Sequence, residues 1–296
     1  MAFGANFVIT RRGVLRASSN YIATISVLIG PLFFIPITAI TGELFRLHQL
    51  HWKVYLFWAL SGIVHFALGR TWAYRSIQLL GANRSNIVTS LSPIATIALA
   101  MIILKERVTA LQLVGIVLTL SGPLLIVLKE QTHSKASQMT SGFHSKEVDL
   151  RTLLLGVAYG IGAAIFWGSS SIFIKFALQA GGTPVGGSLI AYTAACLVIS
   201  PSFLFIPENR RELLSGDRRS LAIGIYNGLS VSIAQLLRYL SLQYGSVIVV
   251  SLMVRTTSLW VLLLSFIFNR EYESFSRWVL LGNGLLMIGA IMVIIF

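Results

Sequence analysis

Long apolar stretches dominate this sequence and restrict the folds open to it. A helix that crosses the hydrocarbon core of a bilayer needs about 20 mostly apolar residues, and a transmembrane β-strand needs only about 9–11. Nine stretches approach or exceed the helical length, each bounded by charges, Gly, Pro or polar clusters: 21–41, 54–77, 87–104, 111–128, 153–178, 185–206, 221–242, 247–268 and 278–296. Their length excludes a β-barrel and predicts an all-α integral membrane protein.

The composition supports the same class. Of the 296 residues, 55% are apolar and only 11% are charged, against about a quarter charged in an average soluble domain. So little charge cannot cover a soluble protein of this length, and the lipid bilayer is therefore the first expected partner. The formal net charge of +13 would suggest nucleic acid in a soluble protein. Here we assign it to cytoplasmic loops and a few buried cations, and we expect no nucleic-acid partner.

A polar segment at 129–151, rich in Ser, Thr, Lys and His, divides the chain into halves at 1–128 and 152–296. The halves show weak internal similarity. A shift of 165 positions aligns YRSIQ (74–78) with YLSLQ (239–243), and a shift of 164 aligns FGANFVITR with WGSSSIFIK. Two repeats joined by a solvated linker are therefore predicted.

The second half contains five apolar helices, whereas the first contains four and a short stub at 1–10. The stub matches only the end of the helix at 153–178, so we expect a first helix shortened by about 15 residues. Five is an odd number, so consecutive repeats must cross the membrane in opposite senses. The expected fold is two inverted five-helix repeats, about ten transmembrane helices in all, with a substrate site near the midplane between them.

Several motifs resemble a known family. The segment GRTWAYRSIQLLGANRSNIVTSLSPIATIALAMIILKE (69–106) resembles the third and fourth helices of an EamA domain of the drug/metabolite transporter superfamily, through SLSP and the closing Glu. FWGSSSIFIK and FNRE resemble a second EamA domain, although RTTS at 255–258 stands where the motif usually has a proline. The resemblance implies a multi-pass secondary-active transporter of the cytoplasmic membrane that works by alternating access, with export as the expected direction.

Cations inside the predicted spans are the first candidates for substrate binding. Arg255 lies too deep in its span to reach either surface easily, and a central arginine costs about 2.5–3.5 kcal/mol on insertion scales. It should therefore face the bundle interior or an aqueous cavity. Arg70 and Tyr74 are one turn apart, and the repeat places Gln235 and Tyr239 at the matching positions. We expect these four side chains to face one cavity, or else to form ordinary interhelical hydrogen bonds.

Four further residues complete the predicted substrate site. His65 lies near the centre of its span and is either a proton relay or a satisfied interior polar group. Arg238 and Lys175 lie close to helix ends, where the alternative to a binding role is a side chain that reaches for the interface. Trp167, with the serines that follow it, is a candidate aromatic and polar lining.

The positions of the acidic residues bear on the charge of the expected substrate. All ten lie in loops or at the ends of spans: Glu43, Glu106, Glu130, Glu147, Asp149, Glu208, Glu212, Asp217, Glu271 and Glu273. Glu106 and Glu271 stand beside basic residues and are expected to form solvated ion pairs. A cation exporter usually needs a buried acid, so the pattern instead favours a small anionic or zwitterionic metabolite such as an amino acid or organic acid. A coupled proton or counter-ion and a homodimer are further possible partners.

Two alternatives stay open at this point: a transporter of cationic or hydrophobic drugs, and a non-transporting or inactive truncated membrane protein. An enzyme is not expected. Neither G-x-S-x-G nor H-E-x-x-H occurs, and no cluster of His, Asp and Glu lies inside the spans. The sequence thus predicts no catalytic residue, no metal site and no cofactor.

Overall fold

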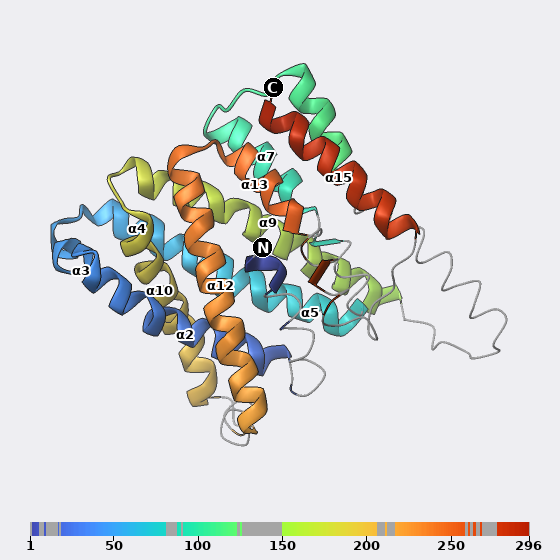
Figure 1. Ribbon diagram of the computed structural model, residues 1–296. Coiled ribbons are helices and arrows are strands. Elements are labelled where there is room, and N and C mark those ends of the chain that lie inside the picture. Colours follow the sequence, from blue (N-terminus) through green and yellow to red (C-terminus); the bar gives the residue numbers. More distant parts are fainter. Residues whose placement is uncertain are drawn as a thin grey trace, which may run out of the picture.

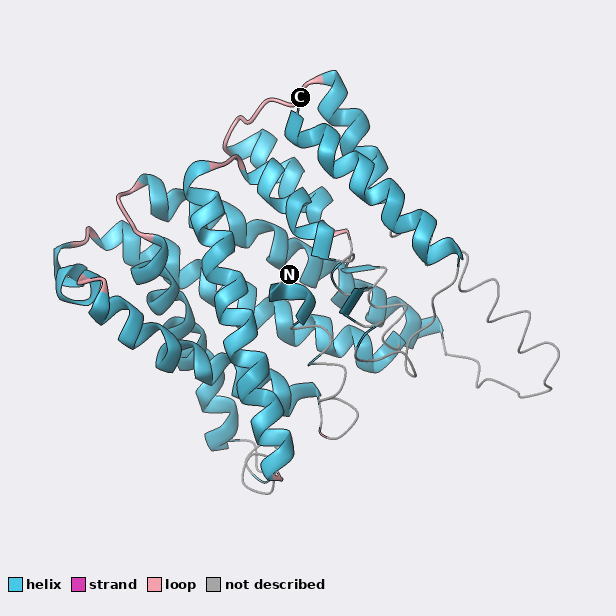
Figure 2. Cartoon of the chain, in the orientation of Figure 1, coloured by secondary structure: helices cyan, strands magenta, loops and turns pink. Residues whose placement is uncertain are grey.

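A computed structural model of the chain describes residues 2–5, 19–80, 91–122, 150–205, 217–257 and 277–295, together with single positions at 9, 17, 88, 89, 125, 211, 260, 263, 264 and 267. Within these ranges every regular element is a helix (Figure 2). The all-α prediction is therefore confirmed for the described part of the chain. Most of the polar linker and the segment 268–276 lie outside it.

The longer helices are α2 (Ser19–Ile40), α9 (Leu150–Gln179), α10 (Pro184–Phe205), α12 (Arg218–Tyr244) and α15 (Arg277–Ile295). One further rod consists of α4 (Trp52–Gly62), a π-helical segment η2 (Ile63–Gly69) and α5 (Arg70–Leu80). The shorter elements are α3 (Glu43–Arg46), η1 (Leu47–Gln49), α7 (Ser92–Ile103), α13 (Val247–Met253) and η3 (Val254–Thr256).

Among the described residues, five helices are long and apolar enough to cross a membrane, by length and composition alone: Tyr21–Ile40, Trp52–Ala73, Leu154–Gln179, Pro184–Pro201 and Arg218–Tyr244. Four shorter apolar helices accompany them: Ser92–Ile103, Ala110–Gly122, Val247–Thr256 and Leu280–Ile295. These nine segments overlap the nine stretches of the sequence analysis. The count of ten helices and the inverted relation of the halves stay predictions.

The two halves of the chain are interleaved in the bundle (Figure 1). Helix α9, from the second half, packs against α4, α5 and α7 of the first. Helix α2 packs against α10 and α12, and α10 also packs against α4. Large apolar side chains such as Ile40, Leu32 and Leu197 are exposed on the outside, as expected for a surface that faces lipid. The core thus lies between the halves.

Small residues allow some of these helices to approach closely. Gly62, in α4, lies against the backbone of Ala191 in α10, where a Cβ would overlap the carbonyl group. Close backbone approach at small residues is a common packing mode of membrane helices, because van der Waals contact there replaces the hydrophobic effect. Gly62 therefore fixes the separation of α4 and α10.

The π-helical segment η2 lies in the middle of a membrane span. It contains His65 and ends next to Arg70. Such i→i+5 segments are rare and occur often at functional sites, because the extra residue in the turn re-aims the side chains around it. The apolar run at 54–77 gave no sign of this segment, since its hydropathy is continuous.

Two charged side chains hold the turn between α12 and α13. The Lys175 ammonium of α9 donates to the carbonyl oxygens of Leu242 and Gly245, at 3.0 and 2.9 Å. The Glu106 carboxylate, just after α7, accepts from the amide of Val247 at 2.8 Å and from that of Ile248 at 3.1 Å. A carboxylate is favourable at a helix N-terminus and an ammonium at a C-terminus.

The Glu106 contact corrects an expectation. Instead of a solvated ion pair with a neighbouring base, Glu106 accepts hydrogen bonds from the first amides of α13. The reason is that helix N-termini leave amide groups without intrahelical partners, and a carboxylate from a neighbouring element satisfies them. Glu271 lies outside the described residues.

Replacing Gly62 with leucine should destabilise the bundle, because the added side chain must push α10 away from α4. We expect the apparent melting temperature in detergent, read by size-exclusion chromatography after heating, to fall by about 5 °C. Gly284→Leu is the matched control, since a Cβ there meets nothing within 4 Å. Equal melting temperatures for the two variants would contradict the packing argument.

Replacing Lys175 with methionine should cost about 1–3 kcal/mol of stability, because two carbonyl groups lose their donor. The same heating assay measures the loss, and Lys175→Arg should restore part of it by keeping the charge and donors. Lys53→Met, at an exposed position, supplies the matched control. A Lys175→Met protein as stable as this control would show that the lysine does not hold the turn.

Candidate functional site

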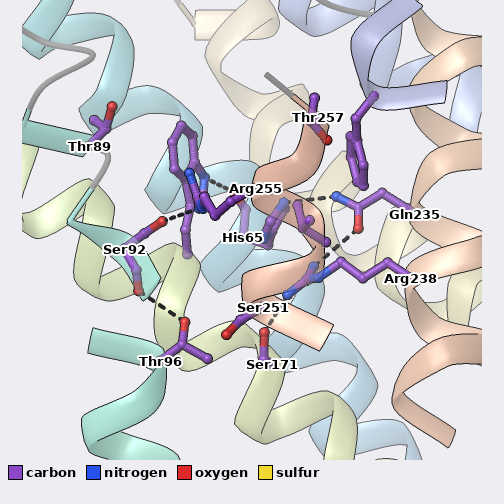
Figure 3. Close-up of a pocket in the computed structure, with 13 residues that line it drawn as sticks. His65, Thr89, Ser92, Thr96, Ser171, Gln235, Arg238, Ser251, Arg255 and Thr257 are labelled. Carbon is purple, nitrogen blue, oxygen red and sulfur yellow. Dashed lines mark hydrogen bonds between the residues drawn. The ribbon is translucent and has the colours of Figure 1, made fainter. Parts of the chain in front are cut away.

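A cavity of about 230 Å³ lies inside the bundle (Figure 3). Its walls come from both halves of the chain, with side chains contributed by η2, α7, α9, α12, α13 and η3. The lining residues are Phe3, His65, Thr89, Ser92, Thr96, Trp167, Ser171, Gln235, Arg238, Ser251, Val254, Arg255 and Thr257. Five of the nine residues predicted for the substrate site are therefore brought together here: His65, Trp167, Gln235, Arg238 and Arg255.

Arg255 reaches the cavity from the short 3-10 turn η3. Its Nη2 atom donates to the Ser92 hydroxyl of α7 at 2.7 Å. Its Nε atom is buried and has no hydrogen-bond partner among the described residues. A guanidinium carries five N–H donors in a planar fork, and the buried Nε–H of Arg255 is left without an acceptor in the described part of the chain.

Arg238 reaches the same cavity from α12 and is bonded more fully. Its Nη1 atom donates to Gln235 Oε1 at 3.1 Å. Its Nη2 atom donates to the hydroxyl of Ser171 and, at 3.5 Å, to that of Ser170. Gln235 is only 2% exposed, so Arg238 is held by α9 and by a buried amide of its own helix.

His65 connects η2 to two other elements. Its Nδ1 atom lies 3.0 Å from Ser170 Oγ of α9, and its Nε2 atom lies 2.9 Å from Gln235 Nε2 of α12. The Trp167 indole donates to the backbone carbonyl of His65 at 3.2 Å. The irregular backbone of η2 is thus fixed by side chains from the second half of the chain.

Other predicted residues lie elsewhere. Arg70 donates to Ser26 Oγ at 2.8 Å and to the carbonyl of Ala23 at 3.2 Å, between α5 and α2. The Tyr239 ring is fully buried and lies 5.1 Å from that of Trp58, centroid to centroid.

Of the four side chains expected to share a cavity, Gln235 lines it, whereas Arg70 and Tyr239 are not among its lining residues. The fourth, Tyr74, has a side chain outside the described part of the structure. Lys175 bonds the α12–α13 turn and is also not part of the lining.

A set of hydroxyl groups was missed by the sequence analysis. Thr89, Ser92 and Thr96 line the cavity from one side, and Ser251 and Thr257 line it near Arg255. The first three follow a spacing of three and four residues, which places side chains on one face of a helix. This periodic hydroxyl face in an otherwise apolar span is the signal from which they could have been found.

The electrostatic character of the cavity is positive. Two guanidinium groups line it, and none of the lining residues that the structure describes carries a carboxylate. No group of three or more His, Cys, Asp or Glu that could hold a metal occurs in the portions of the chain with described coordinates. Hydroxyl and amide groups supply the remaining polar surface. Such a cavity can bind the carboxylate or phosphate of a small molecule, because both match the donor fork of arginine.

Comparisons with known proteins point to membrane transporters. The chain is 28% identical over 130 residues to the "Uncharacterized inner membrane transporter YhbE" of Escherichia coli K12, and equally to that of Shigella flexneri. The match covers 43% of this chain but only 35% of the relative's length. A solved structure titled "Crystal structure of protein" covers 99% of this chain and 95% of its own with a TM-score of 0.73, at 15% identity, which shows a shared fold.

The family itself is shown by a broader match. The model of the EamA-like transporter family matches residues 1–128 and 154–295, nearly the whole chain. Together with the apolar helices, this match places the chain in a family of multi-pass membrane transporters. The protein belongs to the EamA-like transporter family, within the drug/metabolite transporter superfamily.

Proposed function

We propose that this protein is a secondary-active exporter of a small anionic or zwitterionic metabolite, such as an amino acid or an organic acid. The observation that carries the proposal is the pair of guanidinium groups, Arg238 and Arg255, in a cavity whose described lining residues include no carboxylate. The substrate moves by alternating access between the two halves, 1–128 and 152–296, and the protein resides in the cytoplasmic membrane.

The energetic cost of buried cations supports an anionic substrate. An arginine inside the membrane needs hydrogen-bond partners or a counter-charge. Within the described part of the chain, Arg255 donates to Ser92 and keeps a buried Nε without a partner. A carboxylate can accept two parallel hydrogen bonds from such a guanidinium, and the bond is strengthened by the low dielectric constant. Arg255 is therefore the anion anchor, and Arg238 is the second cationic contact.

The size of the cavity supports a small metabolite. Pockets for drug-sized ligands measure about 300–1,000 Å³, and this one measures about 230 Å³. The positive lining also disfavours a cationic drug, because the guanidinium groups repel it. The aromatic ring of Trp167 and the amide of Gln235 are suited to contact the uncharged part of the substrate.

The alternative of an inactive protein arose from the short first segment. In support of a functional site, Phe3 belongs to the cavity lining, and the carbonyl of Ala2 accepts a hydrogen bond from Ser230 at 3.0 Å. The segment present therefore contributes to the wall. Export as the direction and a homodimer stay predictions.

Replacing Arg255 with glutamine should remove at least about 30-fold of anion affinity, because truncating one member of a buried charged pair costs about 2–5 kcal/mol. Uptake and efflux by purified protein in proteoliposomes, screened with amino acids, organic acids and phosphorylated metabolites, measure the effect. Saturable transport of one of these anions by the unaltered protein is the expected first result.

Arg107→Gln makes the same chemical change at an exposed loop position and should transport normally. Both variants must insert and elute as folded protein for the comparison to count. Equal transport by the Arg255→Gln and Arg107→Gln proteins would remove Arg255 from the site. Saturable transport of an organic cation instead of an anion would refute the proposed substrate class.

A further inference from the structure

The hydrogen bonds around His65 specify which of its nitrogen atoms carries a proton. Arg238 is a donor only, so the Gln235 atom that it contacts at 3.1 Å must be the acceptor oxygen. The amide group of Gln235 therefore turns its NH₂ toward His65, at 2.9 Å from Nε2. Because that NH₂ has no lone pair to offer, His65 Nε2 must accept and cannot carry a proton.

The other side of the ring leads to the same conclusion. The Ser170 hydroxyl donates to the carbonyl of Trp167 at 2.8 Å, so its oxygen is free to accept from His65 Nδ1 at 3.0 Å. The bonds thus run in one direction, from Arg238 through Gln235 and His65 to Ser170 and the Trp167 carbonyl. This chain fixes His65 as the neutral tautomer protonated on Nδ1.

The charged groups near His65 all have one sign. Arg238 faces it from α12, Arg70 follows it in the same rod, and Arg255 lines the same cavity from η3. Tyr192 of α10 packs on the neighbouring ring of Phe66, with the centroids 4.3 Å apart. None of the described groups packed around His65 is a carboxylate. An empty cavity therefore provides no counter-charge for an imidazolium.

We propose that His65, Gln235 and Arg238 couple anion binding to the uptake of one proton, so that the transporter moves its substrate together with a proton. This inference rests on the proposed function. A carboxylate that binds Arg238 accepts the hydrogen bond that Nη1 donates to Gln235 Oε1 when the cavity is empty. The released amide turns over and presents Oε1 to His65 Nε2, which can then hold a proton delivered by a hydronium ion or a protonated buffer molecule and donate it in a hydrogen bond to Gln235.

The exchange balances in protons and in hydrogen bonds. One proton moves from a hydronium ion or a protonated buffer molecule in the cavity to His65 Nε2, so that one bond to hydrogen breaks in the donor and one N–H bond forms; the donor is left as water or as the free buffer base. The guanidinium of Arg238 loses the amide oxygen of Gln235 as its acceptor and gains a carboxylate oxygen. His65 Nε2 changes from a hydrogen-bond acceptor to a donor. The negative charge of the anion compensates the positive charge gained by the ring. Release of the anion returns Gln235 to Arg238, which removes the acceptor of the His65 proton and expels it.

The test is the number of protons taken up per anion bound, measured by isothermal titration calorimetry in buffers of different ionisation enthalpy. Pyruvate, lactate and glutamate are the probes, because their carboxylates stay ionised throughout. At about pH 7.5, where free imidazole is mostly neutral, the wild-type protein should take up close to one proton. The stoichiometry, not the affinity, is the readout.

Two variants and one control identify the group responsible. His65→Asn should bind with close to zero proton uptake. Gln235→Glu should also show close to zero uptake, since its carboxylate accepts from both His65 and Arg238 and keeps the ring protonated before the anion arrives. His48→Asn makes the same chemical change at an exposed position and should keep the wild-type value.

Three results would overturn the proposal or its foundation. Anion binding by the wild-type protein without proton uptake would reject the coupling and leave the proposed function intact. Wild-type uptake in either the His65→Asn or the Gln235→Glu protein would reject these residues as the coupling device. Absence of binding by the wild-type protein to all three anions would instead count against the proposed function.

Discussion

The cost of placing a cation in a low-dielectric bundle organises much of this structure. An arginine or lysine buried inside the described spans needs oxygen atoms as partners, since hydrocarbon offers none and no carboxylate lies mid-span in the sequence. Arg70 finds a serine and a backbone carbonyl of α2, and Lys175 finds two carbonyls at the end of α12. In both cases the cation binds one helix to another. These contacts hold the bundle together around the cavity.

The two cavity arginines differ from these in how far their donors are used. Arg238 bonds an amide oxygen and two serines, whereas Arg255 bonds one serine and keeps a buried Nε unpaired among the described residues. An unsatisfied buried donor costs free energy unless a ligand or water accepts from it. The Nε–H of Arg255 thus lacks a hydrogen-bond acceptor, and an anion bound in the cavity would supply one.

Hydropathy alone made much of the fold predictable. Each of the nine apolar stretches overlaps a helix in the described part of the chain, because a bilayer forces continuous apolar runs to satisfy their backbone groups as helices. The distribution of the cations was less predictable. The position of Arg238 near a helix end is compatible with a side chain that reaches the interface, yet Gln235 and Ser171 hold it in the cavity. Internal similarity suggested a shared role for Arg70 and Gln235, but matched positions in two diverged halves meet different neighbours.

The hydroxyl lining and the π-helical segment show another limit of the sequence. The spacing of Ser92 and Thr96 indicates a shared helix face, but nothing in the sequence shows that Arg255, 163 positions away in the chain, lies opposite and bonds Ser92. The same holds for His65, whose ring is fixed by Ser170 and Gln235 from helices remote in sequence. Side-chain direction in a bundle depends on tertiary contacts, and a single sequence does not contain these pairings explicitly.

Because the two halves are interleaved, the hydrogen bonds of the cavity join residues from both halves. His65 and Ser92 belong to the first half of the sequence, and Gln235, Arg238 and Arg255 belong to the second. The hydrogen bonds of His65 and Arg255 therefore cross between the halves that alternating access requires to move. A ligand that replaces or rearranges these bonds changes the contacts between the halves as well as the charge of the site. In the proposed mechanism, the groups that recognise the substrate also connect the two halves, so binding and conformational change share one source of free energy.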